Sequence, residues 1–167
     1  MNYIKFLQSQ LKLGGWHSIE EYYDWVRAQV GEIPRHETYW GIVVEELQAL
    51  GITWMCNAAP ESRVFYTDEN ILAKIIPFLT YPADYYVASL KIDCDDYSLW
   101  AQADVSKIFN LNSVFQTWGY VPEGYHAFSL AKVGDNQYRI WEPNAGFAVA
   151  GELFEIGTYG YKPEKWK

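Results

Sequence analysis

The C-terminal half of the chain restricts the fold more than any other part. Three runs rich in aromatic and β-branched residues, 113–121, 125–133 and 137–142, are separated by turn signals. Such runs are typical of consecutive β-strands. This half is therefore expected to form a sheet, and whatever precedes it has to pack against that sheet.

Helical patterns dominate the first half. Ser18 and Glu21 form a capping box ahead of apolar residues at helical spacing that end at Gly31. Further helices are expected over 3–13, over 40–50 and from Thr67 or Asp68 towards Pro77, with short strands over 52–56 and 63–66. A chain in which helices come first and strands follow is expected to have an α+β fold. We expect a single domain over 1–167, of which residues 1–80 are mainly helical.

Composition predicts a packed globule. Apolar residues make up 50% of the chain and aromatic residues 18%, unlike the charged, aromatic-poor composition of disordered chains. Aromatic side chains pack cores more often than they line a groove for peptide or sugar. Their number alone therefore identifies no ligand.

Charge and hydropathy argue against two classes of partner. The formal charge is −8 and the basic residues are scattered, whereas a nucleic-acid surface needs clustered Lys and Arg. The locally basic end, 161–167, is expected to be a solvated tail. No apolar run is long enough to span a membrane, and the N-terminus is too polar for a signal peptide. We expect no membrane partner and a soluble, cytoplasmic protein by default.

The cysteines and histidines do not form a recognisable metal site. Two cysteines are too few for a disulfide-dense scaffold, so free thiols are expected, with Cys56 buried in the strand over 52–56. The three histidines are too dispersed for zinc spacing. His36-Glu37 begins an H-E-x-x-H pattern, but Trp40 stands where the second ligand must be.

The second cysteine, Cys94, falls in the first turn of a predicted helix. Asp93 is a plausible N-cap, and Asp95 and Asp96 favour a helix start because acidic groups interact well with the positive end of the helix dipole. The same field favours a thiolate, which is the reactive form of cysteine. The three carboxylates oppose it, so a cationic partner is needed.

His126, near the start of the second predicted strand, is the expected partner and would act as base and then acid. Glu142 and Asn144 follow after the turn, and either can accept a hydrogen bond from the far imidazole nitrogen. A three-residue loop at 134–136 places Asn144 opposite His126 and Glu142 diagonally on the same face, whereas a two-residue loop would not. Helix-on-sheet packing must then bring Cys94 alongside.

Each of these residues also has an ordinary interpretation. Cys94 alone is more often a small buried apolar residue, His126 alone is more often structural, and the segment 142–144 alone would be a turn. Together they stand in the order nucleophile, base and orienting group, on a helix start and two neighbouring strands. That order favours catalysis.

These motifs resemble the transglutaminase-like and papain-like cysteine peptidase superfamily. The likeness covers residues 85–147, through the helix-start Cys-Asp-Asp, the Gly-x-His-Ala strand and the Trp-Glu-Pro hairpin. It implies a central helix that carries Cys94 and packs on an antiparallel sheet, with His126 and Glu142 on adjacent strands. Glu142 stands where the transglutaminase-like motif more often has Asp, and 142–146 is similar to the Asp-Pro-Asn-x-Gly of some papain-like peptidases. Glu142 is the first expectation for the orienting group and Asn144 the second.

One residue of the papain-like pattern is missing. That pattern has a Gln shortly before the cysteine in its oxyanion hole, and none occurs between Gln48 and Cys94. The backbone N–H of Cys94 can contribute instead. The side-chain candidates are Tyr85, Tyr86 and Trp100.

The resemblance implies a cysteine peptidase or amidase that acts on a peptide or protein substrate through a thioester. A transglutaminase-type acyl transferase and a non-catalytic binding or structural module on a degenerate peptidase fold are the alternatives. No cofactor is expected. Calcium at Asp93, Asp95 and Asp96 is the less favoured interpretation, because no full oxygen-ligand loop is visible.

Overall fold

The computed structural model describes residue 15, residues 17–87 and residues 92–167. One compact unit ends at Glu32, and the other spans Ile33–Lys167. The helix predicted over 3–13 lies outside the described residues. Within the first unit, helix α2 (Ile19–Val30) begins as its capping box predicts, with the Ser18 hydroxyl accepting a hydrogen bond of 3.1 Å from the Glu21 N–H.

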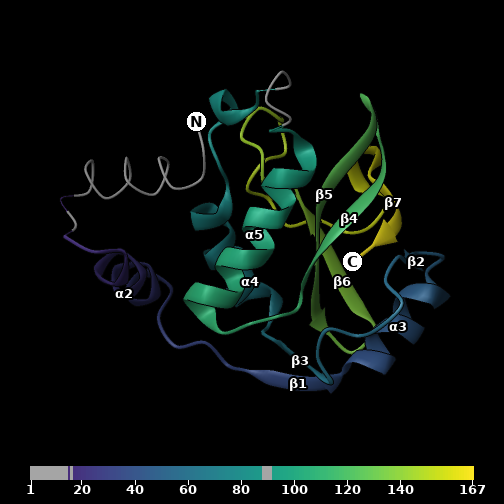
Figure 1. The fold of residues 1–167 in the computed structure, drawn as a ribbon, viewed down its shortest axis with the longest axis horizontal. Helices are drawn as coiled ribbons and strands as arrows, with labels where there is room; N and C mark the ends of the chain where they lie inside the picture. The colour runs from purple at the N-terminus through teal and green to yellow at the C-terminus, as the bar shows by residue number, and fades with distance from the viewer. Residues whose placement is uncertain (1–14, 16, 88–91) are drawn as a thin grey trace. The chain divides into compact units, whose positions relative to one another are not determined.

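The second unit is built on a five-stranded sheet in the order β2-β7-β4-β5-β6, with the strands labelled in Figure 1. The strands are β2 (Thr53–Trp54), β4 (Val114–Val121), β5 (Gly124–Gly134), β6 (Gln137–Trp141) and β7 (Lys162–Trp166). The β2–β7 pair is parallel and the other pairs are antiparallel. The predicted α+β class is confirmed. The sheet is mixed, however, and not wholly antiparallel as the resemblance implied, because β7 pairs in parallel with β2.

The remaining elements surround this sheet. Strands β1 (His36–Tyr39) and β3 (Arg63–Tyr66) form a separate antiparallel pair, of which only β3 was expected. The helices are α3 (Trp40–Ala49), α4 (Glu69–Ile75) and α5 (Cys94–Phe109), with short 3-10 turns η1 (Ile76–Leu79), η2 (Ala83–Tyr85) and η4 (Thr158–Gly160). Among the described helices, none combines the length and apolar character needed to cross a membrane.

Helices α3 and α5 pack on opposite faces of the sheet, as alternation along β4 shows. Phe115 joins a buried cluster with Trp40 and Leu47 of α3. The neighbouring residues Val114 and Gln116 point the other way, and the Gln116 amide contacts the start of α5. Successive side chains of a strand face opposite sides. In Figure 1 the same arrangement puts α5 and α3 on either side of β4 and β5.

The basic C-terminal end is a strand of the sheet, which corrects the expectation of a solvated tail. Strand β7 lies between β2 and β4, so its backbone is paired on both edges. Trp166 has no exposed surface, and its ring lies 4.8 Å from Phe115 and 5.5 Å from Trp40 between centroids. The basic residues Lys162, Lys165 and Lys167 are exposed, while Tyr161 and Trp166 are buried. Charge alone drew attention to the exposed residues and not to the two buried aromatic ones.

The β5–β6 hairpin has the predicted register, but its turn differs from the predicted three-residue loop. Its turn has two residues, Asp135 and Asn136, and Gly134 pairs with Gln137. A bulge between Lys132 and Gly134 then shifts the pairing by one residue, so that Ser129 lies opposite Trp141. A two-residue turn plus one bulged residue gives the same alignment as a three-residue loop. Regular pairing stops at Trp141.

Replacement of Trp166 tests the place of β7 in the core. We expect Trp166→Ala to lower the free energy of unfolding by about 3–5 kcal/mol, because it empties a large, fully buried site. Trp166→Phe should cost less, since the buried indole N–H has no hydrogen-bond partner in the described structure. Urea unfolding measures both, with the exposed Lys165→Ala on the same strand as control. If 161–167 were a solvated tail, all three variants would have the same free energy of unfolding.

Candidate active site

Helix α5 holds Cys94 at its first helical position. Asp93 is the N-cap, its carboxylate accepts from the Asp96 N–H, and the Asp96 carboxylate accepts from the Asp93 N–H at 3.1 Å. This reciprocal pair fixes the first turn. Cys94 is half-buried there, at the positive end of a 16-residue helix.

Two side-chain hydrogen bonds tie this turn to the sheet. The Gln116 amide on β4 donates to the Asp95 carbonyl at 2.6 Å, and the Ser98 hydroxyl on α5 donates to the Phe128 carbonyl at 2.8 Å. Phe128 lies on β5 just beyond the last residue that pairs with β6. The start of α5 is thus anchored two residues along the strand from His126.

The structure brings Cys94, His126 and Glu142 together. The His126 Nε2–H donates to Glu142 Oε2 at 2.8 Å, which leaves Nδ1 for the Cys94 side chain, whose interaction with the ring helps to raise the pKa of His126. His126 and Glu142 are both buried. The order is therefore thiol, imidazole and carboxylate, as in a nucleophile, base and orienting group.

Glu142 has no exposed surface and is satisfied by three donors. Oε2 accepts from His126 and from the Tyr161 hydroxyl at 3.2 Å, and Oε1 accepts from the Asn144 N–H at 2.9 Å. Asn144 thus binds Glu142 through its backbone N–H, while the side-chain oxygen of Asn144 accepts a hydrogen bond from the Gly146 N–H at 2.9 Å. A buried carboxylate needs such partners to remain charged.

The electrostatics of the site favour a charged imidazole. Burial lowers the pKa of His126, but hydrogen bonds to Cys94 and Glu142 and the charges of both groups outweigh burial and raise the pKa to about 9. At neutral pH the ring is then the cation that the thiolate needs beside it. Burial, with the Glu142 charge, also raises the pKa of Tyr161, so that its hydroxyl remains a donor.

The acidic residues next to Cys94 repel one another, and this shows in the pKa of Asp95. A hydrogen bond with Asp93, partial burial and the charges of Asp93 and Asp96 raise the pKa of Asp95 to about 6. Like charges this close disfavour full ionisation. The three carboxylates lie within 4.8 Å of one another, and helix capping already accounts for Asp93 and Asp96.

The backbone offers the best donor for an oxyanion. The capping box uses the N–H groups of Asp93 and Asp96, whereas the Cys94 N–H, at the first helical position, has no intrahelical acceptor. The Trp100 ring packs against Tyr81 and Tyr97. Tyr85 is buried in η2, and Tyr86 is exposed at its end.

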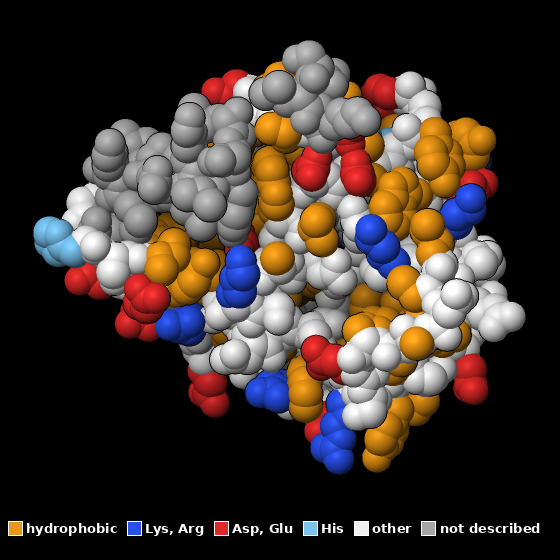
Figure 2. Space-filling view, in the orientation of Figure 1, with side chains coloured by type: hydrophobic (Ala, Val, Ile, Leu, Met, Phe, Trp, Pro, Cys, Tyr) orange, Lys and Arg blue, Asp and Glu red, His pale blue; other side chains and the backbone are white. Residues whose placement is uncertain are grey.

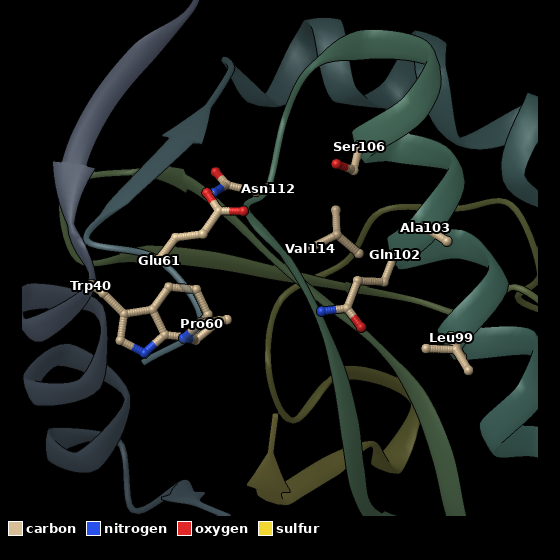
Figure 3. Close-up of a pocket in the computed structure, with 9 residues that line it drawn as sticks. All are labelled: Trp40, Pro60, Glu61, Leu99, Gln102, Ala103, Ser106, Asn112 and Val114. Carbon is tan, nitrogen blue, oxygen red and sulfur yellow. The ribbon is translucent and has the colours of Figure 1, made fainter. Parts of the chain in front are cut away.

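One cavity lies against α5, and a second is lined by residues that contact the triad. The larger, about 260 Å³, lies between Trp40 and the Leu99 to Ser106 side of α5 and includes none of the three site residues; Figure 3 shows Gln102 pointing into it. The smaller, about 130 Å³, is lined by Phe147 and Tyr161. The Phe147 ring packs against His126 with centroids 4.6 Å apart and planes tilted by 32°, and the Tyr161 hydroxyl donates to Glu142.

Sequence reasoning missed four residues of the site and misplaced one thiol. Gln116, Ser98, Tyr161 and Phe147 lack a motif, because their roles depend on which segments the fold brings together. Cys56 lies beyond the two-residue β2 and is exposed. The expectation of a buried Cys56 is therefore wrong, since the strand ends at Trp54 and leaves the thiol outside the core.

Comparison with known proteins adds the fold and nothing finer. No protein-family model matches the chain, and no curated protein matches its sequence. Among solved structures, a chain described as "PSL1a-E64 complex" matches with a TM-score of 0.56 and 15% identity, over 78% of this chain and 50% of that one. The present chain spans about half the length of that structure. At this identity the likeness concerns the fold alone.

Alkylation by iodoacetamide tests the contact between Cys94 and His126. We expect Cys94 to be alkylated near neutral pH faster than Cys56, although Cys56 is the more exposed, because only Cys94 has an imidazolium partner and a helix start. Mass spectrometry of the modified peptides gives both rates across a pH series.

The variant His126→Ala should slow Cys94 alkylation near neutral pH, towards the rate of Cys56 in the same chain. Cys56→Ser serves as the control that must leave the Cys94 rate unchanged. An unchanged Cys94 rate in His126→Ala would show that the neighbouring carboxylates, and not His126, set the reactivity.

Proposed function

We propose that the protein is a cysteine hydrolase of the peptidase or amidase type, with Cys94 as nucleophile, His126 as base and acid, and Glu142 as the group that orients and charges His126. The observation that carries the proposal is the 2.8 Å hydrogen bond from His126 to a fully buried Glu142, with the Cys94 side chain close enough to His126 to raise its pKa. A structural imidazole would not need a buried carboxylate on one nitrogen and a half-buried thiol at a helix start on the other.

The geometry supports a two-step reaction on an amide. The Cys94 thiolate attacks the carbonyl carbon, and the resulting oxyanion faces the Cys94 N–H. The C–N bond breaks as His126 gives its proton to the leaving nitrogen, which forms a thioester. Water then attacks the thioester, His126 takes a proton from it, and the carboxylic acid leaves as the thiolate is restored.

The fold comparison is consistent with this proposal and suggests a probe. The matching solved structure is described as a complex with E64, so we would incubate this chain with E64 and read the intact mass. A mass increase on wild-type protein that is lost in Cys94→Ala, and kept in Cys56→Ser, would support a shared active-site chemistry.

Digestion of a randomised peptide library tests hydrolysis directly. Mass spectrometry should find new N-termini with the wild-type chain and none with Cys94→Ala, while His126→Ala lowers the rate by roughly 10²- to 10⁴-fold. An acyl transferase would instead give products that incorporate an added primary amine. Intact binding of peptides with no thiol reactivity would indicate a non-catalytic module.

The pH dependence of kcat/KM gives a further prediction. Because the pKa of His126 is raised to about 9, activity should fall as the pH rises through that value and the imidazolium loses the proton it must donate. Glu142→Gln removes a hydrogen bond and a charge that both raise this pKa, so the alkaline limb should move to lower pH, with a smaller loss of rate than in His126→Ala. The exposed Glu164→Gln is the matched control, and an unmoved limb in Glu142→Gln would exclude Glu142 from the role.

A further inference from the structure

The smaller cavity beside His126 has a composition of its own. Its walls include three aromatic rings, from Phe147, Tyr159 and Tyr161, and the aliphatic Val149. Among the described residues that line it, the carboxylate of Glu123 at the exposed end of the β4–β5 turn is the one ionisable group other than the tyrosines, and none is Lys or Arg.

Glu123 is available to a ligand. Within the described part of the chain it makes no ion pair and no side-chain hydrogen bond, and its charge contributes to the raised pKa of Tyr161, which also lines the pocket. Aromatic faces attract a cation near the ring, and a long basic side chain places its aliphatic stem on apolar walls with the charged end outward. One open carboxylate beside three rings therefore suits an ammonium or guanidinium group.

The charge around the site favours the same ligand. The chain carries a formal charge of −8, and Figure 2 shows acidic side chains gathered near the upper end of α5. Asp93, Asp95 and Asp96 crowd the helix start there. Such a field draws cationic substrates towards the site and disfavours anionic ones.

The position of the pocket selects one side of the scissile bond. Phe147 touches both the pocket and the His126 ring, with 4.6 Å between the ring centroids. His126 gives its proton to the leaving nitrogen, so the amine portion of the substrate must lie on the His126 side. A side chain in the pocket thus belongs to the residue that supplies the amide nitrogen.

We propose that this pocket binds the basic side chain of the residue on the amine side of the cleaved amide, with its stem between Phe147, Tyr159 and Tyr161 and its charged end at Glu123. The inference rests on the proposed hydrolase and deepens it, because it names the substrates. They are peptides in which Lys or Arg supplies the nitrogen of the cleaved amide bond.

Binding to Cys94→Ala protein tests the pocket without catalysis. Lysine amide and norleucine amide differ only at the side-chain terminus, and both are titrated by NMR. We expect lysine amide to bind about three- to tenfold more tightly, from one partly exposed charge pair and the aromatic walls. Glu123→Gln should remove most of this difference and Tyr159→Leu part of it, while Glu164→Gln should keep it. Equal binding of the two amides, or equal losses in the two Glu variants, would overturn the pocket assignment.

Cleavage by the wild-type chain tests the assignment to the amine side. Two peptide libraries are used, randomised except for Lys or norleucine at one position, and new N-termini are read by mass spectrometry. Preferred release of N-terminal Lys, lost in Glu123→Gln, supports the proposal. Cleavage without that preference overturns the pocket and leaves the hydrolase. Selective binding of lysine amide with no cleavage overturns the hydrolase and leaves a cation site.

Discussion

The buried carboxylate of Glu142 is the constraint on which the rest of the site depends. Removing a carboxylate from water is expensive unless donors replace the lost hydration. Here one donor comes from each of three places in the chain: His126 on β5, Asn144 after β6, and Tyr161 just before β7. A folded state that satisfies Glu142 must therefore have these three segments in place, so the geometry around the imidazole is specified by the sheet as a whole.

Sequence reasoning succeeded where local patterns decide structure. The capping box at Ser18 and the helix start at Cys94 follow from residues within one turn, and the alignment of Glu142 with His126 follows from alternation along two neighbouring strands. Each of these depends on a few adjacent residues, and the structure places them as those patterns predict.

It failed where distant segments meet. In the sequence, β7 resembles a basic tail, and only the structure shows it between β2 and β4. Tyr161 belongs to no motif, and only the structure shows its hydroxyl donating to Glu142. Gln116 lies on β4, well after Cys94 in the chain, yet its side chain donates a hydrogen bond to the helix turn that carries the thiol. Cys56 was misplaced because a strand boundary was drawn two residues too far. Tertiary pairing, which no local pattern encodes, decided all four.

The bulge in the β5–β6 hairpin has a consequence for how this chain tolerates change. Insertion or deletion of one residue in a hairpin exchanges the two faces of everything beyond it. The extra residue, Val133, lies on β5, and the turn itself is short. The turn and the bulge together therefore decide which face of the sheet each β6 side chain occupies. A lengthened turn is compatible with Glu142 facing His126 only if the bulge is lost at the same time. Related chains that keep the buried carboxylate should therefore vary these two features as a pair, and single-residue length changes in this hairpin should be rare among them.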